Sequence, residues 1–151
     1  MADAEMVINA RDFDGLKKHL DNPEFIRGPA RRFIMRGGLT IQTQVTTRTP
    51  VDTGNLRSRI ALAIQDEGLT AQVGTNVTYA PHVEYGTRPH MPPVSAMQPW
   101  ASRHVFGAGN AGAWRIARII AKYGTKARRM FRDGMGASRP IIEADLRVLA
   151  S

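Results

Sequence analysis

The chain has 151 residues, no cysteine and a formal net charge of +8. This length suits one domain with a real hydrophobic core, and the composition excludes disulfides and thiolate metal sites. No apolar run approaches the roughly 20 residues of a membrane span, and the acidic start excludes a signal peptide, so we expect a soluble protein made in the cytoplasm.

The positive charge is concentrated in the last third of the chain. Residues 1–100 hold 11 Lys/Arg and 10 Asp/Glu, a net of +1, whereas residues 101–151 hold 10 and 3, a net of +7. A basic block of this kind can face nucleic acid or an acidic protein surface, or it can be a solvated helix face.

The first predicted elements are short. Val7 and Ile8 suggest an edge strand, and Asp12 can cap a short helix that ends at Pro23. A long helix is then predicted over residues 24–47, because apolar residues recur on one helical face. Gly37 and Gly38 weaken that helix, and we expect them to allow close approach of another backbone.

The hydrophobic period then changes from helical to alternating. Residues 56–65 alternate between apolar and polar, residues 66–68 form a turn signal, and alternation resumes at residue 71. This pattern predicts an antiparallel hairpin over about 56–77, followed by one or two helical turns over 79–85.

Residues 86–93 (GTRPHMPP) are predicted to be a projecting loop, because proline disfavours helices and sheet interiors. Helices are expected over 95–105, 113–123 and 138–149, with a flexible break over 107–112. Met97 and Trp100 are the expected anchors of the first helix, and Trp114, Ala117, Ile120 and Ala121 share one side of the second. On the third helix, Ile142, Leu146 and Leu149 are expected to face inward.

The sequence contains no convincing catalytic or cofactor-binding motif. Gly107, Gly109 and Gly112 match a dinucleotide-binding spacing, but they follow a helix where that motif requires a strand. His82, Glu84 and His90 fit no standard metal-ligand spacing, and no nucleophile elbow is present. We expect no enzyme, no metal and no cofactor. Asp52 is predicted to accept backbone N–H bonds in a turn.

The best case for phosphate contact is a basic cluster in which aromatic residues interleave. An alternative is that the aromatic side chains are core and the bases face solvent, and the lack of a recognised nucleic-acid motif favours it. The possible DNA-facing residues are Lys122, Lys126, Arg128, Arg129 and Arg132.

A short sequence is repeated within the chain. Tyr-Gly-Thr followed by a base occurs at residues 85–88 and again at 123–126. We interpret the repeat as two similar element ends and not as a duplicated domain.

Two short motifs, TPVDTGNLRS at 49–58 and YAPHVEYGT at 79–87, resemble the signatures of a phage tail-component family typified by the tenth gene product of an HK-type lambdoid phage. A subgroup of this family has sequences that the later part of the chain also resembles, at RPHMPP, at Trp100 and at IARIIAKYGTKARRMF. The resemblance therefore extends over most of the chain, from about residue 7 to the last helix.

The resemblance implies an α+β fold: a small antiparallel sheet, made of the hairpin and the edge strand, packed against the long helix and the C-terminal helices. We expect a single domain, 1–151, with a basic helical part over about 95–151. The turn at 52–54 is expected to be shaped by Gly54, and Leu56 is expected to anchor the strand in the core.

The resemblance also implies a structural virion protein at the neck or tail top that joins head to tail around the DNA channel. Its subunits would form a homo-oligomeric ring, six copies favoured over twelve, and would contact connector or stopper and tail-terminator proteins. The alternative from the residues is a basic nucleic-acid-binding module. The expected oligomer-interface residues, on the loop and its base, are Tyr79, Glu84, Tyr85, Arg88, Pro89, His90, Met91, Pro92 and Pro93.

Overall fold

The computed structural model describes residues 22–104 and 109–149. The expected edge strand at Val7 and Ile8 and the short helix after Asp12 lie outside the described residues. The described elements are α2 (Pro23–Arg48), α3 (Asn55–Ser58), β1 (Ile60–Gln65), the 3-10 turn η1 (Asp66–Gly68), β2 (Thr70–Thr75), α4 (Ala80–Tyr85), α5 (Val94–His104), α6 (Gly109–Tyr123) and α7 (Met130–Leu149).

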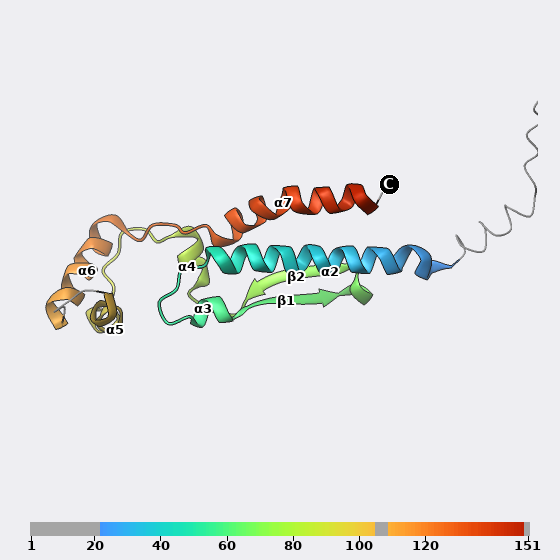
Figure 1. Cartoon of the computed structure of the whole chain (residues 1–151). Helices are drawn as coiled ribbons and strands as arrows, with labels where there is room; N and C mark the ends of the chain where they lie inside the picture. The colour runs from blue at the N-terminus through green and yellow to red at the C-terminus, as the bar shows by residue number, and fades with distance from the viewer. Residues whose placement is uncertain (1–21, 105–108, 150–151) are drawn as a thin grey trace, which may run out of the picture.

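These elements form two regions (Figure 1). The body consists of α2, α3, the β1–β2 hairpin, α4 and α7, with the hairpin on one side of α2 and α7 on another. The lobe consists of α5 and α6, which pack on each other beyond the C-terminal end of α2. Two chain segments, 86–93 and 124–129, run between the regions, and we call them the connector. The helices with a small antiparallel sheet confirm the predicted α+β class.

The long helix α2 begins and ends where local chemistry requires. Asn22 Oδ1 accepts a hydrogen bond from the Glu24 N–H at 3.1 Å, and Pro23 occupies the first helical position, where a missing N–H costs nothing. Thr49 precedes Pro50, is extended, and ends the helix. The predicted range, 24–47, is confirmed within one residue at each end.

Close packing around α2 depends on glycine. A Cβ atom on Gly38 would lie 2.7 Å from Leu62 Cδ1 and 3.0 Å from Ala71 Cβ, so the hairpin can pack here only against a bare backbone. This confirms the predicted close approach at Gly38, but not at Gly37, where a Cβ would lie 3.8 Å from the nearest atom, Ile142 Cδ1. On α7, a Cβ on Gly134 would lie 3.0 Å from the Val45 Cα and N atoms, so the axes of α2 and α7 also approach through a glycine.

The hairpin is shorter than predicted. β1 and β2 pair antiparallel from Ile60↔Thr75 to Gln65↔Thr70, and Asp66 and Glu67 adopt positive φ in the turn between them. Residues 55–58, which we expected to begin the first strand, form helix α3 instead. Leu56 is buried as predicted, at 5% exposure, but it reaches the core from α3. A four-residue alternation is too short to distinguish a strand from one helical turn.

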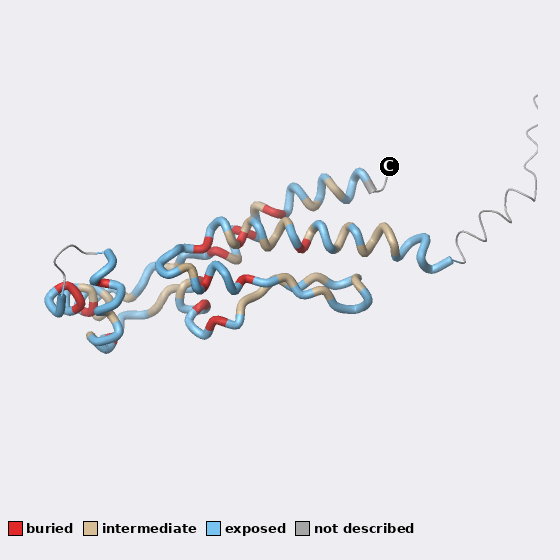
Figure 2. The backbone as a smooth tube through the Cα atoms, turned by 60° about the horizontal axis from the view of Figure 1, so that its bottom comes forward, coloured by how far each residue is buried: buried red, intermediate tan, exposed pale blue. Residues whose placement is uncertain are grey.

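The buried side chains fall into two groups, one in each region (Figure 2). The cluster in the body contains Leu56, Val77, Ala80 and Met130, whereas the cluster in the lobe is built on two alanines, Ala101 and Ala113. Val94, Met97 and Ile116 cover the lobe cluster. In the described part of the chain, the largest fully buried side chains are Met130, Val45 and Ser138, all in the body.

The C-terminal helices differ from the prediction at their starts and faces. Gly109 to Gly112, part of the predicted break, is the first turn of α6, and α7 begins at Met130 instead of residue 138. Leu146 is 53% exposed, so its predicted inward orientation is wrong, and Trp100 and Trp114, 41% and 47% exposed, lie largely at the surface of their helices.

Candidate assembly site

The proline-rich segment 86–93 leaves the body, as predicted, but it leads into the lobe and is not a free arm. Thr87 and Thr125 form an isolated antiparallel bridge between the two connector segments. The Thr87 N–H donates to the Thr125 carbonyl at 3.1 Å, the Thr125 N–H donates back at 3.2 Å, and the two hydroxyl oxygens lie 3.0 Å apart. These bonds tie the lobe to the body.

The bridge is made by the two copies of Tyr-Gly-Thr. Helix α4 ends at Tyr85 and α6 ends at Tyr123, so the interpretation as two similar element ends is confirmed. Gly86 and Gly124 both have positive φ, +73° and +70°, and a Cβ on either would overlap the backbone carbonyl oxygen of the opposite segment. Only glycine satisfies both the angle and the space. We call residues 85–87 and 123–125 the paired bridge.

A second attachment joins the turn at Asp52 to helix α5. Arg103 donates two hydrogen bonds to the Asp52 carboxylate, Nε to Oδ1 at 2.9 Å and Nη2 to Oδ2 at 2.6 Å. This geometry is the bidentate pair that guanidinium favours. Hydrogen bonding from Arg103 lowers the pKa of Asp52, and the same bonds raise the pKa of Arg103. Asp52 was expected to cap its own turn, but its carboxylate is bound by the lobe.

Glu84 joins α4 to the start of α7. Its carboxylate oxygens accept the N–H groups of Phe131 at 2.9 Å and Arg132 at 3.0 Å, and its side chain is buried, with the residue 6% exposed. A carboxylate at a helix N-terminus satisfies free N–H groups and complements the helix dipole. Glu84 is thus bound inside the subunit, where it positions the start of α7.

Most other residues of the expected interface are accessible. Tyr85 is 80% exposed, Met91 is 51% exposed and Tyr79 is 43% exposed. Pro92 is buried, and the His90 N–H donates to the Ile120 carbonyl at 3.4 Å, which fixes the loop against α6. The remaining expected residues, Arg88, Pro89, His90 and Pro93, are exposed.

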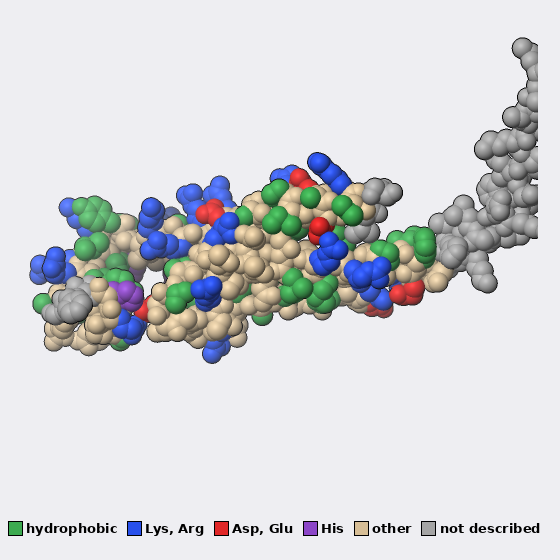
Figure 3. All heavy atoms as spheres, in the orientation of Figure 1, with side chains coloured by type: hydrophobic (Ala, Val, Ile, Leu, Met, Phe, Trp, Pro, Cys, Tyr) green, Lys and Arg blue, Asp and Glu red, His purple; other side chains and the backbone are tan. Residues whose placement is uncertain are grey.

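The five bases singled out from the sequence are all exposed on α6, the connector and the first turn of α7. Arg115 and Arg118 on α6 extend the row. Figure 3 shows Lys and Arg side chains gathered along this side of the molecule. We call the set the basic ridge; its members are Arg115, Arg118, Lys122, Lys126, Arg128, Arg129 and Arg132.

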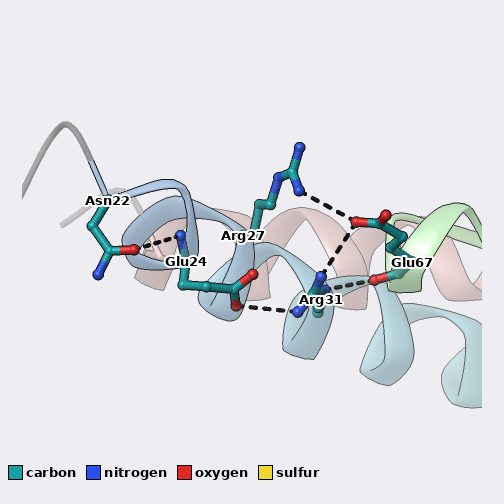
Figure 4. A network of polar contacts seen from close by, with 5 residues as sticks. All are labelled: Asn22, Glu24, Arg27, Arg31 and Glu67. Carbon is teal, nitrogen blue, oxygen red and sulfur yellow. Dashed lines mark hydrogen bonds and ion pairs between the residues drawn. The ribbon is translucent and has the colours of Figure 1, made fainter.

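The bases of α2 are arranged differently from those of the ridge. Arg27 and Arg31 both approach the Glu67 carboxylate, at 3.2 and 3.7 Å, and Arg31 also pairs with Glu24 at 3.1 Å (Figure 4). Arg31 Nε donates to the Glu67 carbonyl at 2.6 Å, which fastens the hairpin turn to α2. Within the described residues, no ridge side chain has an ion-pair partner.

Nothing in the described residues gathers three or more potential metal ligands. Of the glycine-rich spacing, Gly109 and Gly112 lie in α6, and position 107 lies outside the described ranges. Among residues 22–104 and 109–149, no helix is long and apolar enough to cross a membrane.

Comparison with known families identifies part of the chain. Residues 30–86 match the family described as "Bacteriophage HK97-gp10, putative tail-component". No curated protein and no solved structure matches the chain. The predicted resemblance is therefore confirmed over this segment, which contains TPVDTGNLRS and all but the last residue of YAPHVEYGT. The matched segment is thus similar to a putative tail component of bacteriophages.

Three motif residues of the matched segment make contacts outside it. Asp52 binds Arg103, Glu84 binds the start of α7, and Gly86 lies against Thr125. The two motifs therefore hold the C-terminal third of the chain in place.

Proposed function

We propose that this protein is a ring-forming structural subunit at the neck or tail top of a tailed phage, joining the head to the tail around the DNA channel. Subunits made in the host cytoplasm assemble into a homo-oligomeric ring, six copies favoured over twelve, between the connector or stopper and the tail terminator. The observation that carries the proposal is the lobe, which extends from a body that contains the matched segment 30–86 and has exposed aromatic and apolar side chains, Tyr85 and Met91, at its base.

The surface of the described region supports an assembly role. Tyr85, next to the connector, and Met91, within it, are large and exposed, while the fully buried core of the described region is small. Exposed apolar groups that gather near one feature mark interaction sites. A ring requires two different surfaces on each subunit, because head-to-tail contacts must close. An elongated subunit with a lobe at one end of its body offers such a pair.

The connector suits contact with a neighbour because it is already ordered. Its prolines and the Thr87–Thr125 bridge fix the backbone before any contact forms. Binding by a preordered segment loses less conformational entropy than binding by a free loop. In this proposal Tyr79, Tyr85, Arg88, Pro89, His90, Met91 and Pro93 contact the neighbour, and Glu84 and Pro92 hold the segment from within.

The test compares two matched double variants by size-exclusion chromatography with light scattering. Tyr85→Ser with Met91→Ser removes the exposed groups at the connector, and Leu39→Ser with Met135→Ser removes groups of similar exposure, 48% and 58%, from the body. We expect wild type and the body variant to form rings whose mass gives the copy number. The connector variant should remain a single folded subunit by circular dichroism.

Three results would reject the proposal. Rings that form equally well in the connector variant would exclude this interface. A wild-type chain that stays monomeric at all concentrations, or antibody labelling of virions away from the neck, would exclude the ring or its position. A monomer that nevertheless binds DNA with steep salt dependence would favour the alternative, a basic nucleic-acid-binding module.

A further inference from the structure

We infer that the basic ridge is a contact surface for the phosphate backbone of duplex DNA, read without regard to sequence. Residues 115–132 contain seven Lys/Arg and no Asp or Glu. The ridge crosses three consecutive pieces of structure, α6, the second connector segment and the first turn of α7. The inference goes beyond the structural role proposed above and does not depend on ring formation.

The ridge bases are available, whereas most other bases among the described residues form hydrogen bonds or ion pairs. Arg27, Arg31 and Arg36 on α2 pair with carboxylates, Arg36 with Asp145 at 2.9 Å. Every ridge base is exposed. In the described part of the chain, the one side-chain interaction of a ridge base is that of Lys122, whose Nζ lies over the Tyr123 ring, 5.0 Å from its centroid. An anion can therefore reach the ridge without breaking an internal ion pair.

The fold aligns the ridge through contacts far apart in sequence. The paired bridge places the end of α6 beside the end of α4. Glu84 then holds the first N–H groups of α7, including that of Arg132. The Arg128 N–H donates to the Val83 carbonyl at 2.9 Å, and the Arg129 N–H donates to the Glu84 carbonyl at 3.1 Å. The backbone under the ridge is thus fixed along its length, which favours an extended, regularly charged partner.

The character of the ridge favours nucleic acid over a protein partner. Between Arg115 and Arg132, where the ridge has seven bases, the large apolar side chains with substantial exposure are Ile119, at 57%, and Tyr123, at 69%. Protein interfaces have cores that are depleted of charge, and Lys in particular is rare there. Phosphate contacts, in contrast, dominate non-specific DNA binding and are made mainly by Lys and Arg. Single strands are bound by successive exposed aromatic side chains, which the connector lacks.

The experiment measures DNA affinity of the full chain by fluorescence anisotropy over a series of salt concentrations. Two labelled duplexes of unrelated sequence are used. The ridge variant carries Arg118→Ala, Lys122→Ala and Lys126→Ala. The control carries Arg32→Ala, Arg57→Ala and Arg147→Ala, which removes the same charge from exposed bases elsewhere that also have no ion-pair partner among the described residues.

We expect both duplexes to bind equally and the affinity to fall about 10³-fold between 50 and 200 mM salt, as for six or more phosphate contacts. The slope of log K against log salt should decrease by roughly three in the ridge variant and be unchanged in the control. Light scattering on the same variants reports ring formation separately, so failure of one proposal does not imply failure of the other.

Three results would overturn the inference. Wild type could fail to bind duplex DNA at low salt. The control could lose as much affinity as the ridge variant, which would assign the effect to overall charge. Polyglutamate of matched charge could compete more strongly than unlabelled duplex, which would assign the ridge to an acidic protein surface.

Discussion

The body and the lobe are both helical, but they are stabilised in different ways. The body packs helices and hairpin through glycines, and Val45 and Met130 are fully buried in it. The lobe is built around two alanines and is tied to the body by the paired bridge and the Asp52–Arg103 ion pair. Because burial of large apolar groups dominates stability, we expect the body to be the more stable unit and the lobe to move or unfold first.

The comparison also explains the two sequence motifs. Leu56 serves the core of the body, but Asp52, Glu84 and Gly86 each bind a part of the chain that follows the family-matched segment. Part of each motif therefore serves to attach the lobe or α7 to the rest of the body. This is a role for a motif that involves neither catalysis nor ligand binding.

The largest predicted effect is on the core of the body. Met130→Ala should lower the free energy of unfolding by about 3 kcal/mol, because it removes a fully buried side chain and leaves a cavity. Met97→Ala, at the partly buried lobe cluster, should cost about 1 kcal/mol.

Both tryptophans of the chain, Trp100 and Trp114, lie in the lobe. Tryptophan fluorescence in a urea titration therefore follows the lobe, while far-ultraviolet circular dichroism mainly follows the body helices. Met97→Ala should shift the fluorescence transition alone. If both signals shift together in both variants, the two regions unfold as one unit and the comparison above is wrong.

The next largest effect concerns the paired bridge. Gly124→Ala should destabilise the lobe by about 2 kcal/mol, because alanine is strained at φ +70° and its Cβ would overlap the Thr87 carbonyl. Gly54→Ala is the matched control: its φ is +82°, but no atom lies within 4 Å, so only the backbone strain of about 1 kcal/mol applies. Gly124→Ala is read in the fluorescence transition of the lobe and Gly54→Ala in the circular-dichroism transition of the body, and equal losses of stability would show that the close approach adds nothing.

The smallest effect concerns the ion pair at Asp52. Because its folded pKa is lowered, the pair contributes above the ordinary carboxyl pKa of about 4 and is lost as pH falls through the lowered value. The pair is exposed, so salt should weaken it. We expect wild type to show a broader lobe-to-body distance distribution in acid or high salt, and Asp52→Asn to be broad throughout.

The measurement is electron paramagnetic resonance between spin labels on Thr47→Cys and Ser95→Cys, because the chain has no cysteine of its own. A narrow distribution in Asp52→Asn at neutral pH would show that the paired bridge alone fixes the lobe.

Elements with strong local signals could be predicted from the sequence. The cap at Asn22, the proline after it and a long apolar face define α2, and alternation around a turn defines the hairpin. Helix α7 was placed eight residues too late, because Gly134 and Gly136 weaken local helix preference. Its first turns form because Glu84 caps them and Gly134 packs on Val45, and both contacts are distant in sequence.

The sequence by itself determined the fold class, the repeated Tyr-Gly-Thr, the two motifs and the location of the positive charge, because periodicity, turn residues and charge are properties of neighbours along the chain. Only the tertiary structure decided that the two repeats pair with each other, that Asp52 binds the lobe, and that Glu84 is an internal cap. Those outcomes depend on contacts between residues 38 to 51 positions apart, which no local pattern encodes.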